Sequence, residues 1–350
     1  MECGCVIRCF LKEKREQELK RKTETKAENK NAAKWATEKE VIKTSFPIYL
    51  TLFCIKCFPQ FIINGLIAII GFFFFLFSKR SRRECLRFQN QFASFVSDKK
   101  DFKEKIPNVY KQIVSFAITL VEKIECWVKK EPVVKVEFAE DDDVYKLIEQ
   151  LNAGKGAFVF VSHLGNSEVL RNLANKNKIF LQREVPVSVL MDLDSTNNFT
   201  NTIEKINPGF TQNIIDVNDI SPATIEKLEE TIEKGGMVVS AGDRISKKAD
   251  SRYFNFDFLG KEAPWSYGVF LLAMLLRAPV YFLFGTRKKD VSFNRKYDVH
   301  VVKSSVNTDC SRKERETNMK MLCLEFVREL EKCCLEHPFQ WYNFYDFWTV

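Results

Sequence analysis

The chain changes character near residue 133, where short apolar runs begin to alternate with amphipathic stretches. We predict strands at 157–162, 185–191 and 237–241, and the first two are each followed by a stretch with helical periodicity. The alternating residues 253–258 predict a further strand, and residues 267–277 predict an apolar helix. Such alternation is typical of a mixed central sheet flanked by helices. The sequence therefore predicts the fold class α/β, with the domain covering residues 133–350.

Three segments of different composition precede this domain. Residues 1–45 form a charged arm, residues 46–78 are hydrophobic, and residues 79–132 have the periodicity of amphipathic helices. Residues 57–78 contain no charged side chain, and a membrane-spanning helix needs about 20 apolar residues. We therefore expect residues 46–78 to be a membrane anchor that spans the bilayer, re-enters it or lies at its surface. A pair of buried core helices is the alternative.

Net charge limits the classes of partner to expect, and cysteine spacing indicates the cellular compartment. The formal net charge of +8 favours an anionic membrane surface, nucleic acid or a phosphorylated substrate, and charge alone does not choose among them. The basic cluster at 79–87 would suit anionic head groups beside the apolar run. The 11 cysteines lack the spacing of a zinc site, so we expect no metal centre and a reducing, cytosol-facing compartment.

The strongest catalytic candidate is the first of only three histidines. His163 follows the predicted strand 157–162 directly, and Glu168 comes five positions later at the expected start of a helix. Strand ends are where α/β proteins build their sites. A carboxylate that orients an imidazole makes it a general base for a hydroxyl. The alternative is a structural histidine with satisfied hydrogen bonds.

A second candidate lies at the end of the predicted strand 237–241. Gly242 permits a close backbone approach, and Arg244 offers a bidentate clamp for a phosphate or carboxylate. Asp243 stands between them. A turn with a surface ion pair is the alternative.

Two weaker patterns are an aromatic ribbon and a pair of aspartates. The aromatic ribbon at 254–258, followed by Trp265 and Gly268, would line a groove for an acyl chain or else pack in the core. Asp192 and Asp194 form a DxD pair that would bind a divalent metal on a nucleotide-sugar. Aspartate is also common in turns, so this pair is a weak signal.

Several of these motifs together resemble the lysophospholipid acyltransferase superfamily. The closest branch is that of the bacterial lipid A biosynthesis (lauroyl/myristoyl) acyltransferases and their predicted-acyltransferase relatives. The resemblance covers roughly residues 35–350. The matching blocks, in order, are 163–168, 242–244, 258–260, 268–270, 278–281 and the C-terminal 338–344.

The resemblance implies a catalytic role for the first block. His163 would be the general base of an O-acyl transfer, and Glu168 the acid of the family's His-x4-acid motif. The expected donor is an acyl thioester on acyl carrier protein or coenzyme A, and the expected acceptor is a hydroxyl of a membrane lipid or glycolipid. No metal or redox cofactor and no nucleic acid are implied. The expected location is the cytoplasmic face of the inner membrane.

The same resemblance assigns substrate binding to six further residues. These are Asn166, Gly242, Asp243, Arg244, Trp265 and Gly268. The acceptor block of the superfamily, often Phe-Pro-x-Gly, reads Trp-Ser-Tyr-Gly at 265–268, which leaves the acceptor open.

Two other functions remain open at this point. One is a metal-dependent glycosyltransferase that uses Asp192 and Asp194. The other is a non-catalytic relative of the acyltransferases that binds lipid. His163 and Glu168, which such a relative would not need, argue against it.

Overall fold

The computed structural model describes residues 46–97, 108–128, 134–138, 143–169, 181–206, 213–245 and 252–348. The charged arm at 1–45 lies outside the described residues. A central sheet has the strand order β1-β9-β8-β2-β5-β3-β4. All neighbouring strands are parallel except the antiparallel pair β8–β9. The predicted mixed α/β fold is confirmed.

The seven strands of this sheet are short, and six of the seven begin after residue 156. They are β1 (Lys135–Phe138), β2 (Ala157–Val161), β3 (Val187–Met191), β4 (Ile214–Asp216), β5 (Met237–Ala241), β8 (Val280–Arg287) and β9 (Lys296–Lys303). Four helices lie between these strands in the chain, α6 (Val144–Asn152), α8 (Leu193–Ile206), α9 (Pro222–Glu233) and α10 (Tyr267–Leu275), and α11 (Arg315–Glu336) follows the last strand.

Strand β2 lies near the middle of the sheet and is buried along its whole length. Because side chains alternate along a strand, its residues divide between two cores. Phe158 and Phe160 belong to the core that includes α10 and α11, and Val159 belongs to the core that includes α6. This burial on both faces fits the continuous apolar run in the sequence.

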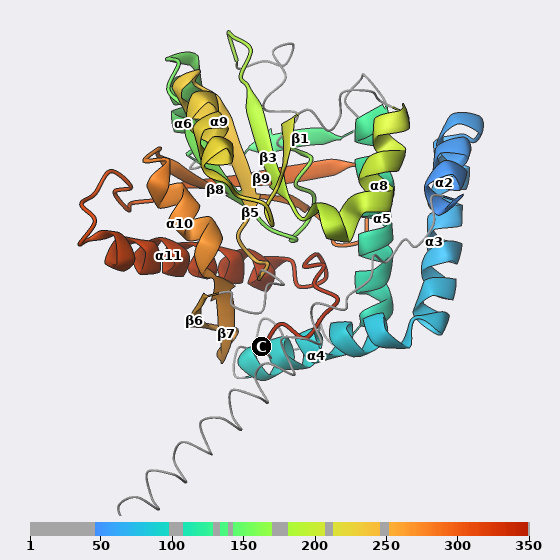
Figure 1. The fold of residues 1–350 in the computed structure, drawn as a ribbon. Helices are drawn as coiled ribbons and strands as arrows, with labels where there is room; N and C mark the ends of the chain where they lie inside the picture. Colours follow the sequence, from blue (N-terminus) through green and yellow to red (C-terminus); the bar gives the residue numbers. More distant parts are fainter. Residues whose placement is uncertain are drawn as a thin grey trace, which may run out of the picture.

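The N-terminal helices form a layer at one side of the molecule. Helix α2 (Phe46–Cys57) is followed by α3 (Gln60–Phe77), which packs along α5 (Val109–Val128), and α4 (Lys79–Phe95) turns beneath them (Figure 1). Gly71 permits this packing, because a Cβ there would lie 3.2 Å from a methyl group of Val114.

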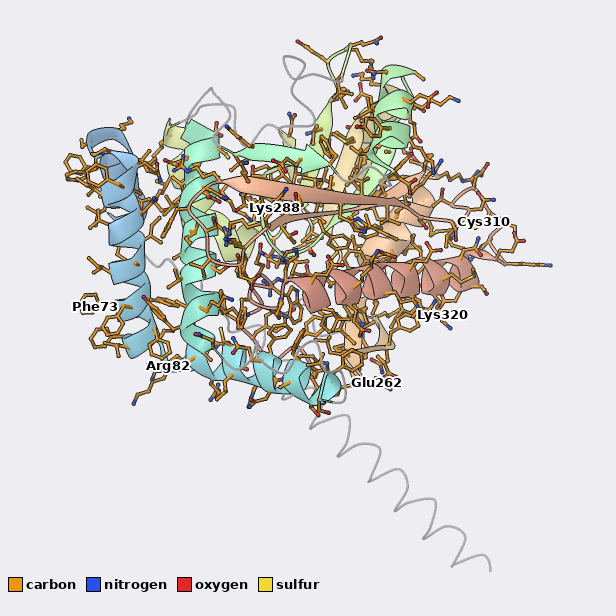
Figure 2. The ribbon with its side chains drawn as sticks, turned by 180° about the vertical axis from the view of Figure 1, so that it is seen from behind. Phe73, Arg82, Glu262, Lys288, Cys310 and Lys320 are labelled. Carbon is orange, nitrogen blue, oxygen red and sulfur yellow. The ribbon has the colours of Figure 1, made fainter. Side chains whose placement is uncertain are left out.

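Helix α3 is the one described helix that is long and apolar enough to cross a membrane. Only 17% of its residues are buried, which argues against the alternative of a buried core helix. Phe73 points away from the body of the molecule, and Arg82 lies at the corner where α4 begins (Figure 2). The Arg82 guanidinium donates to the main-chain carbonyls of Phe75 and Leu76, and so provides hydrogen-bond donors for carbonyls in the last turn of α3.

The aromatic ribbon forms one strand of a separate hairpin. Strand β6 (Tyr253–Phe258) pairs antiparallel with β7 (Lys261–Ser266). The two-residue turn uses Leu259 and Gly260, both with positive φ, as a type I′ turn requires. The hairpin packs against α11, so its inward-facing aromatic side chains join the larger core.

Candidate active site

The site is built where two neighbouring parallel strands end. Val161 of β2 is paired with Ala241 of β5, so both strands stop at the same edge of the sheet. His163 and Asp243 each follow the last residue of their strand by two positions. The parallel register therefore brings together two residues that are 80 positions apart in the chain.

Asp243 holds His163 by both its main chain and its ring. Oδ2 of Asp243 accepts the main-chain N–H of His163 at 2.8 Å, and Oδ1 lies 2.8 Å from the ring nitrogen Nδ1. The indole N–H of Trp341 also donates to Oδ2, at 3.1 Å. Burial alone would raise the pKa of Asp243, but the contacts with His163 and Arg244 outweigh it and lower the pKa to about 2. The carboxyl is therefore ionised at neutral pH.

The environment favours the neutral form of His163. Burial and the charge of Arg244 lower the pKa of the imidazole, and the opposing effect of Asp243 is smaller. The ionised Asp243 can only accept a hydrogen bond, so Nδ1 of His163 carries the ring proton and donates it to Oδ1. Nε2 then carries the free lone pair. The side chain is 37% exposed, which leaves it accessible to a substrate. A neutral, accessible imidazole of this kind is suited to act as a general base.

Arg244 lies against the imidazole of His163 and is fixed by several contacts. Its Nη1 donates to Oδ1 of Asn343 at 3.0 Å, and its guanidinium lies 4.7 Å from the ring centroid of Tyr345. Its Nε is 3.2 Å from each ring nitrogen of His163, so this N–H is not directed at one nitrogen alone. The guanidinium is thus a positioned positive charge beside the candidate base.

The C-terminal segment holds the turn after β2 in place. Tyr342 donates its main-chain N–H to the carbonyl of His163 at 2.9 Å, and the N–H of Gly165 donates to Gln340 at 2.8 Å. Gly165 has a φ of +65°, and a Cβ there would lie 1.9 Å from the carbonyl oxygen of Gly285. Only glycine fits this turn.

Lys123 enters the same site from helix α5, and none of the sequence motifs contains it. Its Nζ lies 3.3 Å from Oγ of Ser167. Burial lowers the pKa of the ammonium, while the negative charges of Glu168 and Asp243 oppose that effect. A signal was present in the sequence, because the charged cluster Glu122, Lys123 and Glu125 follows the mostly apolar stretch 113–121 of this helix.

Comparison with known protein families assigns the chain to a family. The family model of the bacterial lipid A biosynthesis acyltransferases matches residues 33–349. The chain belongs to this family. The resemblance inferred from the motifs is thereby confirmed, and the protein is an acyltransferase that acts on lipid. No curated protein matches the sequence in a direct search.

Within this acyltransferase, the first motif differs in one respect from our expectation. We expected Glu168 to orient His163, whereas the structure places the carboxylate of Asp243 on Nδ1. Glu168 lies in the following turn, where its N–H donates to Oδ1 of Asn166, and its charge acts on Lys123. Asn166 is fully buried and braces the turn with that oxygen.

Three other predicted substrate-binding residues lie in different settings. Gly242 is packed beneath Phe326, whose ring would lie 2.7 Å from an added Cβ. Trp265 is buried in the core between the β6–β7 hairpin and α11, which is the packing alternative we considered, and it lines no open groove here. Gly268 lies in the first turn of α10 with open space beside it.

The DxD pair follows strand β3. Asp192 accepts a hydrogen bond from the side-chain amide of Asn218 at 2.9 Å. The side chain of Asp194 lies outside the described residues. Membership of the acyltransferase family favours acyl transfer over the glycosyl transfer that this pair suggested.

Proposed function

We propose that this acyltransferase moves a fatty acyl group from an acyl thioester to a hydroxyl of a lipid or glycolipid. The thioester is carried by acyl carrier protein or coenzyme A. The observation that supports this proposal is the pairing of the accessible His163 with the buried Asp243 at the carboxyl edge of the sheet, in a chain of this family.

The chemistry follows from the protonation states at this pair. Nε2 of His163 takes the proton of the acceptor hydroxyl as its oxygen attacks the thioester carbonyl. The imidazolium that forms is stabilised by the ionised Asp243. When the tetrahedral intermediate collapses, the C–S bond breaks and the thiolate takes the proton from His163. The two substrates supply every group that is transferred, so we propose no cofactor.

Arg244 and Glu168 have supporting roles in this proposal. Arg244 is held by Asn343 and Tyr345, so its charge is available to a phosphate or carboxylate of the substrate at little entropic cost. Glu168 lies beside Lys123 and partly offsets its positive charge. Asp243, which we first expected to bind substrate, is proposed here as the residue that positions His163.

The N-terminal helices are proposed to hold the enzyme at the cytoplasmic face of the membrane. Helix α3 turns one side toward α5, and its other side exposes large apolar side chains, among them Phe61, Ile69, Ile70, Phe73 and Phe77. The basic residues that start α4 lie beside this surface, where they would meet anionic head groups. Positive charge of this kind favours the cytoplasmic side.

The direct test is transfer of labelled acyl groups to an extract of membrane lipids. The purified full chain is given a radiolabelled acyl group on acyl carrier protein or on coenzyme A. We expect a labelled lipid from at least one donor, and its chromatographic mobility identifies the acceptor. If neither donor yields a labelled lipid while a known acyltransferase does so in the same extract, the proposal is wrong.

A further inference from the structure

The transition state of acyl transfer carries a negative charge that needs a hydrogen-bond donor. In many acyl-transfer enzymes, main-chain N–H groups near the catalytic residue supply it. In this chain, most main-chain N–H groups of the turn after His163 already donate a hydrogen bond within the protein, so they are not available to an oxyanion. Of residues 163 to 169, all except Ser167 donate their main-chain N–H within the protein: His163 to Asp243, Leu164 to Ser162, Gly165 to Gln340, Asn166 to Gly285, and Glu168 and Val169 to Asn166.

Arg244 is also committed to contacts within the protein. Its Nη1 donates to Asn343, its Nη2 lies 3.5 Å from the carbonyl oxygen of Tyr342, and its Nε faces the ring of His163. Moving the guanidinium to an oxyanion would break these contacts. Arg244 is therefore suited to bind a substrate group that reaches it, and less suited to follow a charge that develops during the reaction.

Lys123 has the donors that the other groups lack. An ammonium carries three N–H groups, and the structure describes one acceptor for them, Oγ of Ser167 at 3.3 Å. Lys123 is also near enough to His163 for its positive charge to lower the pKa of the imidazole. Helix α5 fixes its position, because α3 and α4 pack on that helix. The ammonium is thus held beside the candidate base with hydrogen-bonding capacity to spare.

We propose that the Lys123 ammonium stabilises the oxyanion of the tetrahedral intermediate, an inference that rests on the function proposed above. The acceptor oxygen forms a bond to the thioester carbon as its proton passes to His163. The carbonyl π electrons move onto the oxygen, which accepts a hydrogen bond from Lys123. As the C–S bond breaks, that electron pair restores the C=O bond and the thiolate takes the proton from His163.

The charges around Lys123 predict how this contribution depends on pH. Glu168, Asp243 and Cys126 favour the protonated form, while burial and Arg244 disfavour it. Burial is the largest effect, so the pKa of Lys123 lies below its ordinary value. The ammonium is therefore lost as the pH rises through this lowered pKa, and activity falls with it. An arginine at position 123 keeps its charge, so the loss of activity would shift to higher pH.

The test compares Lys123→Met and Lys123→Arg with the wild type, using a labelled acyl thioester and the membrane lipid extract. We expect Lys123→Met to lower kcat by about 10²–10³-fold, as the loss of one oxyanion donor does in other enzymes, with KM changed little. We expect Lys123→Arg to retain more activity and to shift the alkaline limb of the pH profile upward. Lys111→Met, on the same helix and paired with Asp290 outside the site, is the control.

The outcomes separate the role of Lys123 from the proposed function. An unchanged kcat in a folded Lys123→Met variant would overturn the oxyanion role, and so would a rise in KM alone, which would indicate ground-state binding. An alkaline limb that stays in place in Lys123→Arg would overturn it as well. If the wild type itself transfers no acyl group to lipid, the proposed function fails first, and the role of Lys123 fails with it.

Discussion

At the scale of single residues, the main finding is that a carboxylate distant in sequence holds His163. The sequence motif directs attention to Glu168, because it lies five positions after the histidine. Asp243 lies 80 positions away and is brought close by the parallel pairing of β2 and β5. This pairing is a long-range contact that local spacing does not contain, so the sequence identified both residues but assigned the orienting role to Glu168.

The exchange of Asp243 for Asn tests that role. Asn keeps the shape of the side chain but lacks the charge that stabilises the imidazolium. We expect Asp243→Asn to lower kcat by about 10²–10⁴-fold. The matched variant is Glu168→Gln, which we expect to be less affected. A larger loss in Glu168→Gln than in Asp243→Asn would return the orienting role to Glu168.

The pH dependence of kcat/KM reports on His163 in the free enzyme. The base must be neutral, and burial lowers its pKa from 6.5. Activity should therefore persist below pH 6.5 and be lost only as the pH falls through the lowered pKa. Because Asp243 raises the pKa of His163, any residual activity of Asp243→Asn should have its acid limb at still lower pH. An acid limb above 6.5 in the wild type would contradict this environment.

At the scale of elements, the sequence pattern predicts secondary structure better than it predicts burial. The polar and aromatic residues of the ribbon at 254–258 alternate as they do in a strand, and the ribbon lies within β6 (Tyr253–Phe258). The same pattern did not show that Trp265 would be buried, because burial depends on α11, which lies about 50 positions later. Lys123 escaped attention for a similar reason, since α5 reaches the site only through tertiary packing.

The turn after β2 provides the prediction at this scale. In Gly165→Ala the new methyl group would meet the carbonyl oxygen of Gly285, and the residue would keep an unfavourable positive φ. We expect a loss of about 2 kcal/mol or more in the free energy of unfolding, with a parallel loss of activity.

Gly268→Ala is the matched control for stability. Gly268 lies in a helix with open space beside it, so the change should be neutral or stabilise by up to about 1 kcal/mol. Thermal unfolding of both variants provides the measurement. Equal stability of Gly165→Ala and the wild type would show that the turn adapts to a side chain.

At the scale of the whole molecule, α3 is bound to the catalytic domain along one side and exposed along the other. This places the apolar surface beside the same helix, α5, that delivers Lys123 to the site. The sequence predicted the apolar helix and its basic flank. It left open whether residues 46–78 form a membrane anchor or a pair of buried core helices. The structure argues against the buried pair, because α3 packs along α5 on one side and only 17% of its residues are buried.

Membrane binding tests the proposed role of this surface. We expect the triple change of Phe72, Phe73 and Phe77 to serine to weaken binding to anionic lipid vesicles, by about tenfold for each phenyl group that no longer enters the lipid. Met321→Ser, an exposed apolar residue on α11, should bind as the wild type does. Sedimentation with vesicles provides the measurement, and undiminished binding of the triple variant would place the membrane contact elsewhere.

The central claim is that His163 is the base for acyl transfer from a thioester to a lipid hydroxyl. The most direct test compares wild type, His163→Ala and His300→Ala in the transfer assay with labelled acyl thioester and membrane lipids. His300 is a histidine on β9 that packs against Phe284, outside the site. We predict labelled lipid from the wild type and His300→Ala, and a loss of at least about 10²-fold in His163→Ala. Full activity in a folded His163→Ala variant would contradict the claim.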